Sequence, residues 1–428
     1  MRKILIVSPH FSPVNAADMH RVRQSLPYFK QYGWEPTVLY VAPEYVEMAK
    51  DQLLLKSLPK DIHIVSVKAY STTYTRKVGL GNLGLRAFKQ LYMAGSKLLR
   101  EQKFNLVYFS TTVFATMPLG RLWKRKFNIP YVIDMQDPWR NDYYLSVPKD
   151  QKPPKFWFAY NLNKYLEKFT IPKVDGLIAV SSGYIEMLKS RYKEIADIPF
   201  KILTFGAAVK DFEFIEHIDI ETSVKLEKKY INFIYIGRGG HDMASSLSVI
   251  FEAFKKGLES NATFEKIRFK FIGTSYAPDG NGEKTITPIA KQMGITDYVE
   301  EITDRKPYFE VLSLLKKADV ILIPGSDDAN YTASKLYPNL LAKKPLICVF
   351  HSSSSVVNIL KDLNGGEIVI FDHQDAVQHC LDKMEVIISK LPFQPNTNWE
   401  KFQTFTAQAM TKEQCDFFNI ILERSRGI

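Results

Sequence analysis

Two acidic residues follow an apolar run in the stretch YVIDMQDPWRNDYY. Asp134 and Asp137 come after a run typical of a buried strand, and in open α/β sheets the residues beyond the carboxyl ends of strands line the ligand crevice. Asp137 is the better site candidate, although an Asp-Pro pair also begins ordinary turns. Trp139 and Arg140 add an aromatic and cationic rim, suited to stacking on a sugar ring or to a lipid interface.

A glycine-rich turn follows another apolar run in NFIYIGRGGHDM. Gly237, Gly239 and Gly240 would let the backbone approach a ligand closely, and Arg238 offers a fork of donors to a diphosphate. A nicotinamide site would need an acidic residue at the end of the next strand to hold a ribose, and none stands there. The turn therefore favours a phosphate-bearing ligand without identifying it.

A second cation comes late in the chain, in GSDDANYTASKLYPNLLAKKPLICV. Ser334 and Lys335 would open a helix after the apolar run VILIP. Helix N-termini carry free amides and a positive dipole end. If this helix faces the same crevice as Arg238, two cations and a helix end could together neutralise a pyrophosphate.

The first turn of the chain, SPHFSPVNAADMHRVRQSL, is a long loop that leads into a helix near residues 16–18. It contains no GxGxxG fingerprint. Asn15, Asp18 and Arg21 would lie where this helix begins, and such a helix end attracts anions. Asp18 is also a common type of N-cap residue.

Short β-branched apolar runs, separated by helix-length segments, must position these side chains. This alternation is typical of parallel sheets covered by helices on both faces. It breaks into a charged, irregular stretch after Gly206, so we predict two α/β domains: residues 1–206 and 207–398, with a final helix over 399–428 that crosses back to the first. The runs are KILIVS, TVLYVA, IHIVSV, LVYFS, YVIDM, GLIAVS and KILTF, then NFIYIG, RFKFIG, DVILIP, PLICVF and GEIVIF.

The positive charge is confined to the first half of the chain. Residues 1–200 hold 30 Lys+Arg against 16 Asp+Glu, whereas residues 201–428 hold 27 against 30. The first half is therefore expected to meet an anionic partner, such as a phosphate-bearing ligand or an anionic membrane, unless its basic face is merely solvated. Nucleic acid has only this charge in its favour, with no recognised module.

Three cysteines, Cys348, Cys380 and Cys415, show no metal-ligand spacing and are expected to be buried thiols. The opening apolar run is too short for a signal peptide, and no run is long enough to span a membrane. We therefore expect a cytoplasmic protein.

In order, these motifs resemble a GT-B-fold glycosyltransferase, similar to the retaining glycosyltransferase family four. The resemblance runs from ILIVSPHFSP through DMQDPW, GLIAVSS, YIGRGG and ADVILIPGS to the terminal helix. It implies two Rossmann-like doubly wound parallel-sheet domains that face each other across a cleft. The first would bind the acceptor, the second a nucleotide-diphosphate sugar.

The resemblance also implies roles for individual residues. Arg238 and Lys335 match the family's basic pair, which would stabilise the departing diphosphate without a metal or cofactor. Asp137, from its own place beyond a strand, is predicted to complete the catalytic set by orienting the attacking hydroxyl. The remaining site residues fall into a donor-binding and an acceptor-binding group: Gly237, Gly239, Gly240, Asn330, Thr332, Ala333 and Ser334 for the donor, and Asn15, Asp18, Arg21, Trp139 and Arg140 for the acceptor.

The chain departs from the family at its Glu-x7-Glu pair, because Asn330 and Pro338 stand in the two glutamate positions. Asn330 can still hydrogen-bond to sugar hydroxyls, but Pro338 could offer a ribose only its carbonyl. A lost charged hydrogen bond is worth about 1.5 to 3 kcal/mol, so donor binding could survive it.

We predict a metal-independent hexosyltransferase of envelope or capsule polysaccharide synthesis, with a saccharide or lipid-linked acceptor. The basic and apolar segment over residues 76–103 suits an anionic membrane face, but could equally be a crossover helix. A nucleotide-sugar epimerase on the same fold and a non-catalytic sugar-nucleotide-binding protein remain alternatives.

Overall fold

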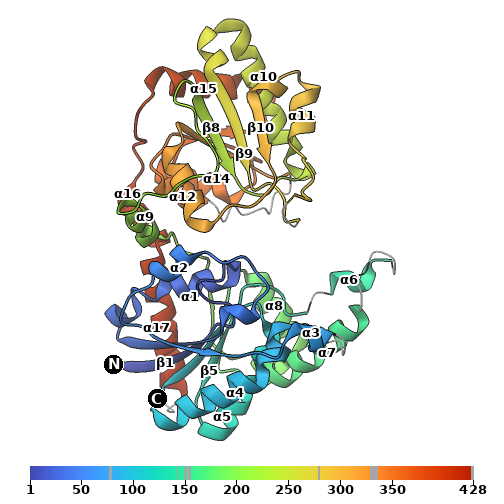
Figure 1. The fold of residues 1–428 in the computed structure, drawn as a ribbon, viewed down its shortest axis with the longest axis vertical. Helices are drawn as coiled ribbons and strands as arrows, with labels where there is room; N and C mark the ends of the chain where they lie inside the picture. The colour runs from blue at the N-terminus through green and yellow to red at the C-terminus, as the bar shows by residue number, and fades with distance from the viewer. Residues whose placement is uncertain are drawn as a thin grey trace. The chain divides into compact units, whose positions relative to one another are not determined.

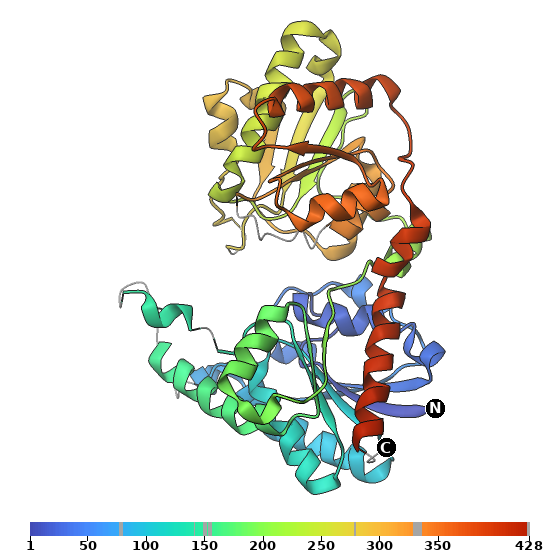
Figure 2. The ribbon, with the colours of Figure 1, turned by 180° about the vertical axis from the view of Figure 1, so that it is seen from behind.

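The computed structural model describes residues 1–76, 80–140, 142–148, 152, 156–277, 280–327 and 336–425. The chain divides into two compact units: Met1–Gly206 with Ala407–Ile428, and Ala207–Thr406. In each unit a parallel sheet lies between helices (Figures 1 and 2).

The sheet of the first unit has seven strands in the order β3-β2-β1-β4-β5-β6-β7. All neighbours are parallel, and β4 and β5 are buried along their whole length because helices cover both faces. Each of the seven predicted runs forms a strand. They are β1 (Arg2–Val7), β2 (Trp34–Val41), β3 (His63–Val67), β4 (Leu106–Ser110), β5 (Tyr131–Met135), β6 (Gly176–Ala179) and β7 (Phe200–Ile202).

The described helices of the first unit differ widely in length. They are α1 (His20–Ser25), α2 (Gln52–Lys56), α3 (Thr72–Thr75), α4 (Leu83–Glu101), α5 (Pro118–Phe127), α6 (Tyr143–Ser146), α7 (Phe156–Thr170), α8 (Ser182–Arg191) and α17 (Ala407–Ser425).

The C-terminal helix α17 returns to the first unit, as the sequence predicted. Gly176 in β6 allows its close approach, because a Cβ there would lie 2.4 Å from Ile421 and 2.9 Å from Phe417. Phe418 packs edge-on against the buried Trp34. A helix does begin at Trp399, but the single helix expected over 399–428 is interrupted. The short helix α16 (Trp399–Phe402) belongs to the second unit, and α17 begins at Ala407.

The sheet of the second unit has six strands in the order β10-β9-β8-β11-β12-β13, all parallel. The sequence predicted five of them and missed β10, whose residues VEEI form an edge strand. The strands are β8 (Ile231–Ile236), β9 (Ile267–Ile272), β10 (Val299–Ile302), β11 (Val320–Pro324), β12 (Leu346–Phe350) and β13 (Glu367–Ile370).

The helices of the second unit enclose an aromatic core in which Phe251 and Phe254 pack edge-on against Phe269. Besides α16, they are α9 (Val209–Glu216), α10 (Ala244–Ser260), α11 (Thr287–Gln292), α12 (Tyr308–Lys317), α13 (Leu336–Leu341), α14 (Ser355–Leu363) and α15 (Ala376–Lys390).

The three cysteines are buried and unpaired, as expected. Among the helices of the described ranges, none combines the length and the apolar character that a bilayer crossing requires.

Candidate active site

The strand order of the first unit reverses direction between β1 and β4, which is where ligands bind in open α/β sheets. His10 lies three residues beyond β1, and its Nδ1 is 3.0 Å from Oδ1 of Asp18. Oδ2 of Asp18 accepts hydrogen bonds from Thr111 Oγ1 at 2.8 Å and the Thr112 amide at 2.9 Å, both just beyond β4. One carboxylate thus joins the two segments that follow the central strands.

The environment of Asp18 keeps this carboxylate ionised. Burial alone would raise its pKa, but the hydrogen bond and charge of His10, with the bonds from Thr112 and Thr111, outweigh burial and lower the pKa below its usual value. An ionised carboxylate only accepts hydrogen bonds, so His10 donates from Nδ1. A neutral His10 then keeps Nε2 as a proton acceptor, on a side chain that is 16% exposed.

Asp137 is exposed at the same edge of the sheet, beyond β5. Partial burial of its carboxyl and the charge of Asp18 raise its pKa. Its own charge in turn contributes to raising the pKa of Tyr184, after burial. Asp137 is therefore electrostatically coupled to the His10 and Asp18 pair and open to a ligand.

The predicted acceptor-binding residues are differently placed. Asp18 does not cap the first helix, where Ala16 is the N-cap, and at 4% exposure it holds His10 instead of facing a ligand. Arg21 is fully buried in an ion pair of 2.7 Å with Asp134 and donates to the Leu203 carbonyl, so it supports the fold.

Trp139, Arg140 and Asn15 also differ from the expected open rim. Trp139 is 3% exposed and stacks on Phe114, which occupies a ring face that a sugar would need. Arg140 is paired with Asp142 at 3.1 Å. Asn15 is half-buried, and its backbone amide is bonded to the Ala49 carbonyl.

The second unit has the same kind of reversal between β8 and β11. Arg238, two residues beyond β8, donates from both terminal nitrogens to Asp242, at 2.9 and 2.6 Å. Ser326, just beyond β11, donates to the same carboxylate at 2.6 Å. The hydrogen bond from Arg238 is the main reason that the pKa of Asp242 falls to about 2. Arg238 therefore lies at the predicted place, but a ligand anion must share it with Asp242.

The glycines beside Arg238 serve the turn itself. The amides of Gly237 and Gly239 donate to the Ile272 and Thr274 carbonyls, at 3.0 and 2.8 Å. A Cβ on Gly240 would lie 2.3 Å from Asp242 and 2.7 Å from Arg238. Gly240 is thus required for the ion pair, while the other two amides are already bonded within the protein.

Several predicted donor residues lie outside the described residues: Asn330, Thr332, Ala333, Ser334 and Lys335. Pro338 is described, in α13, and its carbonyl accepts the Ala342 amide at 3.1 Å. The ribose contact that remained open to Pro338 is therefore already used within the helix.

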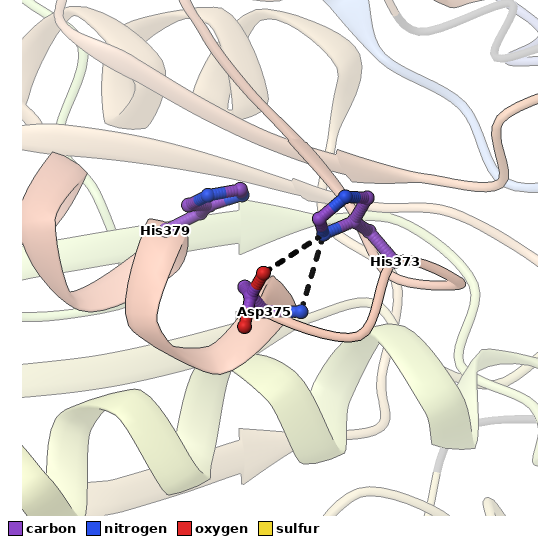
Figure 3. Close-up of side chains that lie close together, drawn as sticks. All are labelled: His373, Asp375 and His379. Atoms are coloured by element: carbon purple, nitrogen blue, oxygen red, sulfur yellow. Dashed lines mark hydrogen bonds and ion pairs between the residues drawn. The ribbon is translucent and has the colours of Figure 1, made fainter.

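A possible metal-binding group in the described part of the chain consists of His373, Asp375 and His379. The two imidazoles stack with centroids 5.2 Å apart, and Nδ1 of His373 accepts the Asp375 amide (Figure 3). All three residues are exposed at the start of α15, where the positive helix end opposes a cation. A metal bound at Nδ1 of His373 would also have to displace the amide, so the geometry favours a helix-start turn.

Sequence reasoning overlooked His10, the two threonines and Ser326. His10 and Ser326 each follow a strand by two or three residues, and Thr111 comes directly after one. That is the criterion that selected Asp137, and it would have found them.

No protein-family model and no curated protein sequence matches this chain. Several solved structures, in contrast, are similar to this chain. The sucrose-phosphate synthase of Thermosynechococcus elongatus is 13% identical with a TM-score of 0.58, covering 99% of this chain and 100% of that one. HepE of Anabaena, in complex with UDP, is 11% identical with a TM-score of 0.56, covering 97% and 99%.

A third structure, the UDP-forming α,α-trehalose-phosphate synthase of Burkholderia xenovorans with glucose-6-phosphate, is 10% identical with a TM-score of 0.54, covering 97% and 100%. At these identities the likeness establishes the fold. The chain has the two-domain GT-B architecture over nearly its whole length.

Proposed function

We propose that the protein is a metal-independent glycosyltransferase that moves a hexosyl group from a nucleotide-diphosphate sugar to a hydroxyl of its acceptor. The observation that carries the proposal is a basic side chain hydrogen-bonded to an aspartate at the strand-order reversal of each sheet: His10 with Asp18, and Arg238 with Asp242. The His10 pair is suited to removing a proton, and the Arg238 pair is suited to binding an anion. The GT-B architecture supports the same division of labour.

On the donor side, Arg238 binds the diphosphate and stabilises the charge that develops on it as the bond to the sugar carbon breaks. The guanidinium is 30% exposed, and a diphosphate of higher charge competes with Asp242 for it. Lys335 is proposed as the second cation, as the resemblance implies.

On the acceptor side, the attacking hydroxyl loses its proton to Nε2 of His10 while its oxygen bonds to the sugar carbon, and the diphosphate leaves with the electron pair. Asp18 holds the tautomer that this step needs, and Asp137 orients the hydroxyl. We propose retention of configuration, with attack from the face that the diphosphate leaves. An inverted product would move the attack to the opposite face and would exclude family four.

The acceptor is proposed to be a carrier-linked saccharide of an envelope or capsule polysaccharide, handled at the inner face of a membrane. The +14 charge of residues 1–200, from 30 Lys+Arg and 16 Asp+Glu, supports an anionic carrier such as a lipid pyrophosphate.

A thermal-shift screen over UDP-, GDP-, ADP-, CMP- and dTDP-sugars tests the proposal, because a specific ligand stabilises the folded state by mass action. We expect one nucleotide series to raise Tm equally with and without EDTA. The stabilising sugar nucleotide, incubated with a lipid-linked saccharide, should then yield free nucleoside diphosphate and a longer saccharide. Conversion of the donor alone would indicate an epimerase, and binding without any product would indicate a non-catalytic protein.

A further inference from the structure

Helix α7 of the first unit buries its polar side. Glu167 is fully buried, where it accepts a hydrogen bond from Tyr192 at 2.9 Å and pairs with Arg191 at 3.3 Å. Tyr160, two turns earlier, donates to Asp142. These charged contacts hold the helix to the unit, so its opposite side is left to carry other side chains.

That opposite side exposes large aromatic residues. Trp157 is 76% exposed, Tyr165 69% and Phe158 51%, and Leu145 of the neighbouring helix α6 is 51% exposed. Trp157 and Tyr165 are eight residues apart, which places them on one side of a helix two turns from each other. Burying such surfaces in water-free surroundings is favourable, so their joint exposure suggests a binding face.

Basic residues share this side of the helix. Lys164 and Lys168 are exposed and fall in the same stripe as Trp157 and Tyr165, at spacings of three, four and seven residues. Within α7 Glu167 is the only acidic residue, and it points inward. The exposed stripe is therefore aromatic and cationic with no carboxylate, and α6 and α7 lie at the edge of their unit (Figure 1).

We propose that this α6–α7 surface, made of Leu145, Trp157, Phe158, Lys164, Tyr165 and Lys168, docks on an anionic lipid bilayer. Trp and Tyr favour the headgroup level of a membrane, and lysines beside them are attracted to anionic lipids. Such a surface lies on the membrane without crossing it. The positive excess of residues 1–200 supports the same partner over a second, equally basic copy of this chain, because two such faces repel each other.

The α6–α7 surface replaces the one that the sequence suggested. Residues 76–103 include α4, whose apolar residues Ala87 and Leu91 are completely buried. Helix α4 is thus an ordinary crossover helix, which was the alternative to a membrane-facing segment. The proposed membrane contact would bring the transferase to a bilayer. The residues that make this contact all lie on α6 and α7, and none of them belongs to the proposed active site.

Vesicle co-sedimentation tests the docking. The full-length protein is mixed with vesicles in the absence of sugar nucleotide and acceptor. One set of vesicles is pure phosphatidylcholine, and the other also contains about 30% phosphatidylglycerol. We expect binding only to the anionic vesicles, weakened at least about tenfold by the Trp157→Ala/Phe158→Ala pair and by raised salt, and weakened less by Lys164→Gln/Lys168→Gln. Tyr276→Ala, at a residue 70% exposed in the second unit, is the matched control and should bind unchanged.

Trp157 also reports on its own insertion. Of the other four tryptophans, Trp34 and Trp123 are fully buried, Trp139 is 3% exposed and only Trp399 is partly exposed. With Trp399→Phe as the background for this measurement, iodide quenching reads mainly Trp157. Anionic vesicles should shift the emission to the blue and protect it from iodide. Equal binding to both vesicle types, binding unaffected by the aromatic pair, or self-association that the aromatic pair abolishes would each overturn the proposal. Because no donor or acceptor is present, failure here leaves the transferase proposal intact.

Discussion

The two strand-order reversals are built alike and differ in the type of basic residue and in the exposure of its partner. At each, a basic side chain beyond the first strand pairs with an aspartate, and that aspartate accepts further hydrogen bonds from residues beyond the neighbouring strand. In the first unit the pair is His10 with Asp18, which is 4% exposed. In the second it is Arg238 with Asp242, whose side chain is 37% exposed.

This difference separates the two kinds of chemistry. Histidine changes charge near neutral pH, and a buried ionised partner fixes which nitrogen is free. Arginine stays charged, and a partly exposed partner can yield it to a stronger anion. The same layout therefore provides a proton acceptor in one unit and a permanent cation in the other.

The largest expected effect is on turnover at the first pair. His10→Gln removes the proton acceptor and should lower turnover by about 10² to 10⁴-fold, the usual contribution of a general base. Asp137→Asn should lower turnover less and leave donor affinity unchanged. Steady-state rates of nucleoside diphosphate release measure both. If His10→Gln turned over as fast as the unchanged protein, His10 would not be the group that accepts the proton.

The next effect concerns stability beneath the first pair. Asp134→Ala leaves the fully buried Arg21 without its partner and should cost about 3 to 5 kcal/mol of unfolding free energy. Urea unfolding followed by tryptophan fluorescence reads mainly this unit, which holds four of the five tryptophans. The double change Arg21→Met/Asp134→Ala removes both charges and should recover part of the loss. If Asp134→Ala alone were neutral, the buried pair would not support this unit.

A smaller effect is expected from the ribose. The carbonyl of Pro338 is used within α13, so nucleotide affinity should depend on phosphate contacts. A nucleoside diphosphate should bind far more tightly than its nucleoside, whereas the loss of one ribose hydroxyl should cost under about 1 kcal/mol. Calorimetry on the three ligands checks this. A large penalty for the deoxy form would show that a carboxylate elsewhere holds the ribose.

The smallest effect is the acid dependence of the second pair. The pKa of Asp242 is about 2 in the folded protein, below its usual 3.8, so its ion pair stabilises above about pH 4 and is lost as pH falls towards 2. Because the pair is partly exposed, Asp242→Asn should cost under about 1 kcal/mol at neutral pH. The difference from the unchanged protein should vanish near pH 2.

Asp416→Asn, in an exposed pair with Lys412 on α17, is the matched control for Asp242→Asn. A difference for Asp242→Asn that persists at pH 2 would assign its cost to something other than the charge.

The fold was largely predictable because buried parallel strands carry unbroken apolar runs. Apolar runs indicated twelve of the thirteen strands, including ones that charged residues interrupt, such as β9 with Arg268 and Lys270. The missed strand, β10, is an edge strand with glutamates at 300 and 301. The Glu301 carboxylate accepts the amides of Ile286 and Thr287 at the start of α11, while its backbone pairs within the sheet. Such a role depends on contacts between distant residues, which a local pattern does not contain.

The site was predictable in position and less so in orientation. Strand ends indicated Asp137 in the first unit and Arg238 in the second, because parallel topology brings the carboxyl ends of the strands to one edge within each sheet. Burial decided the rest. Arg21 lies at the start of a helix and Trp139 in a loop, and both look open in the sequence, yet Asp134 pairs with Arg21 and Phe114 stacks on Trp139. Side-chain partners from other elements determine whether a polar or aromatic residue faces a ligand, and sequence spacing does not reveal them.

The division between the two pairs can be tested in one calorimetric experiment. The nucleoside diphosphate selected by the thermal-shift screen is titrated, with EDTA present, into the unchanged protein, His10→Gln and Arg238→Gln. Arg238→Gln should bind about 10- to 100-fold more weakly, as for a lost charged hydrogen bond, and His10→Gln should match the unchanged protein within about twofold. Undiminished affinity in Arg238→Gln, or an equal loss in both variants, would contradict the account.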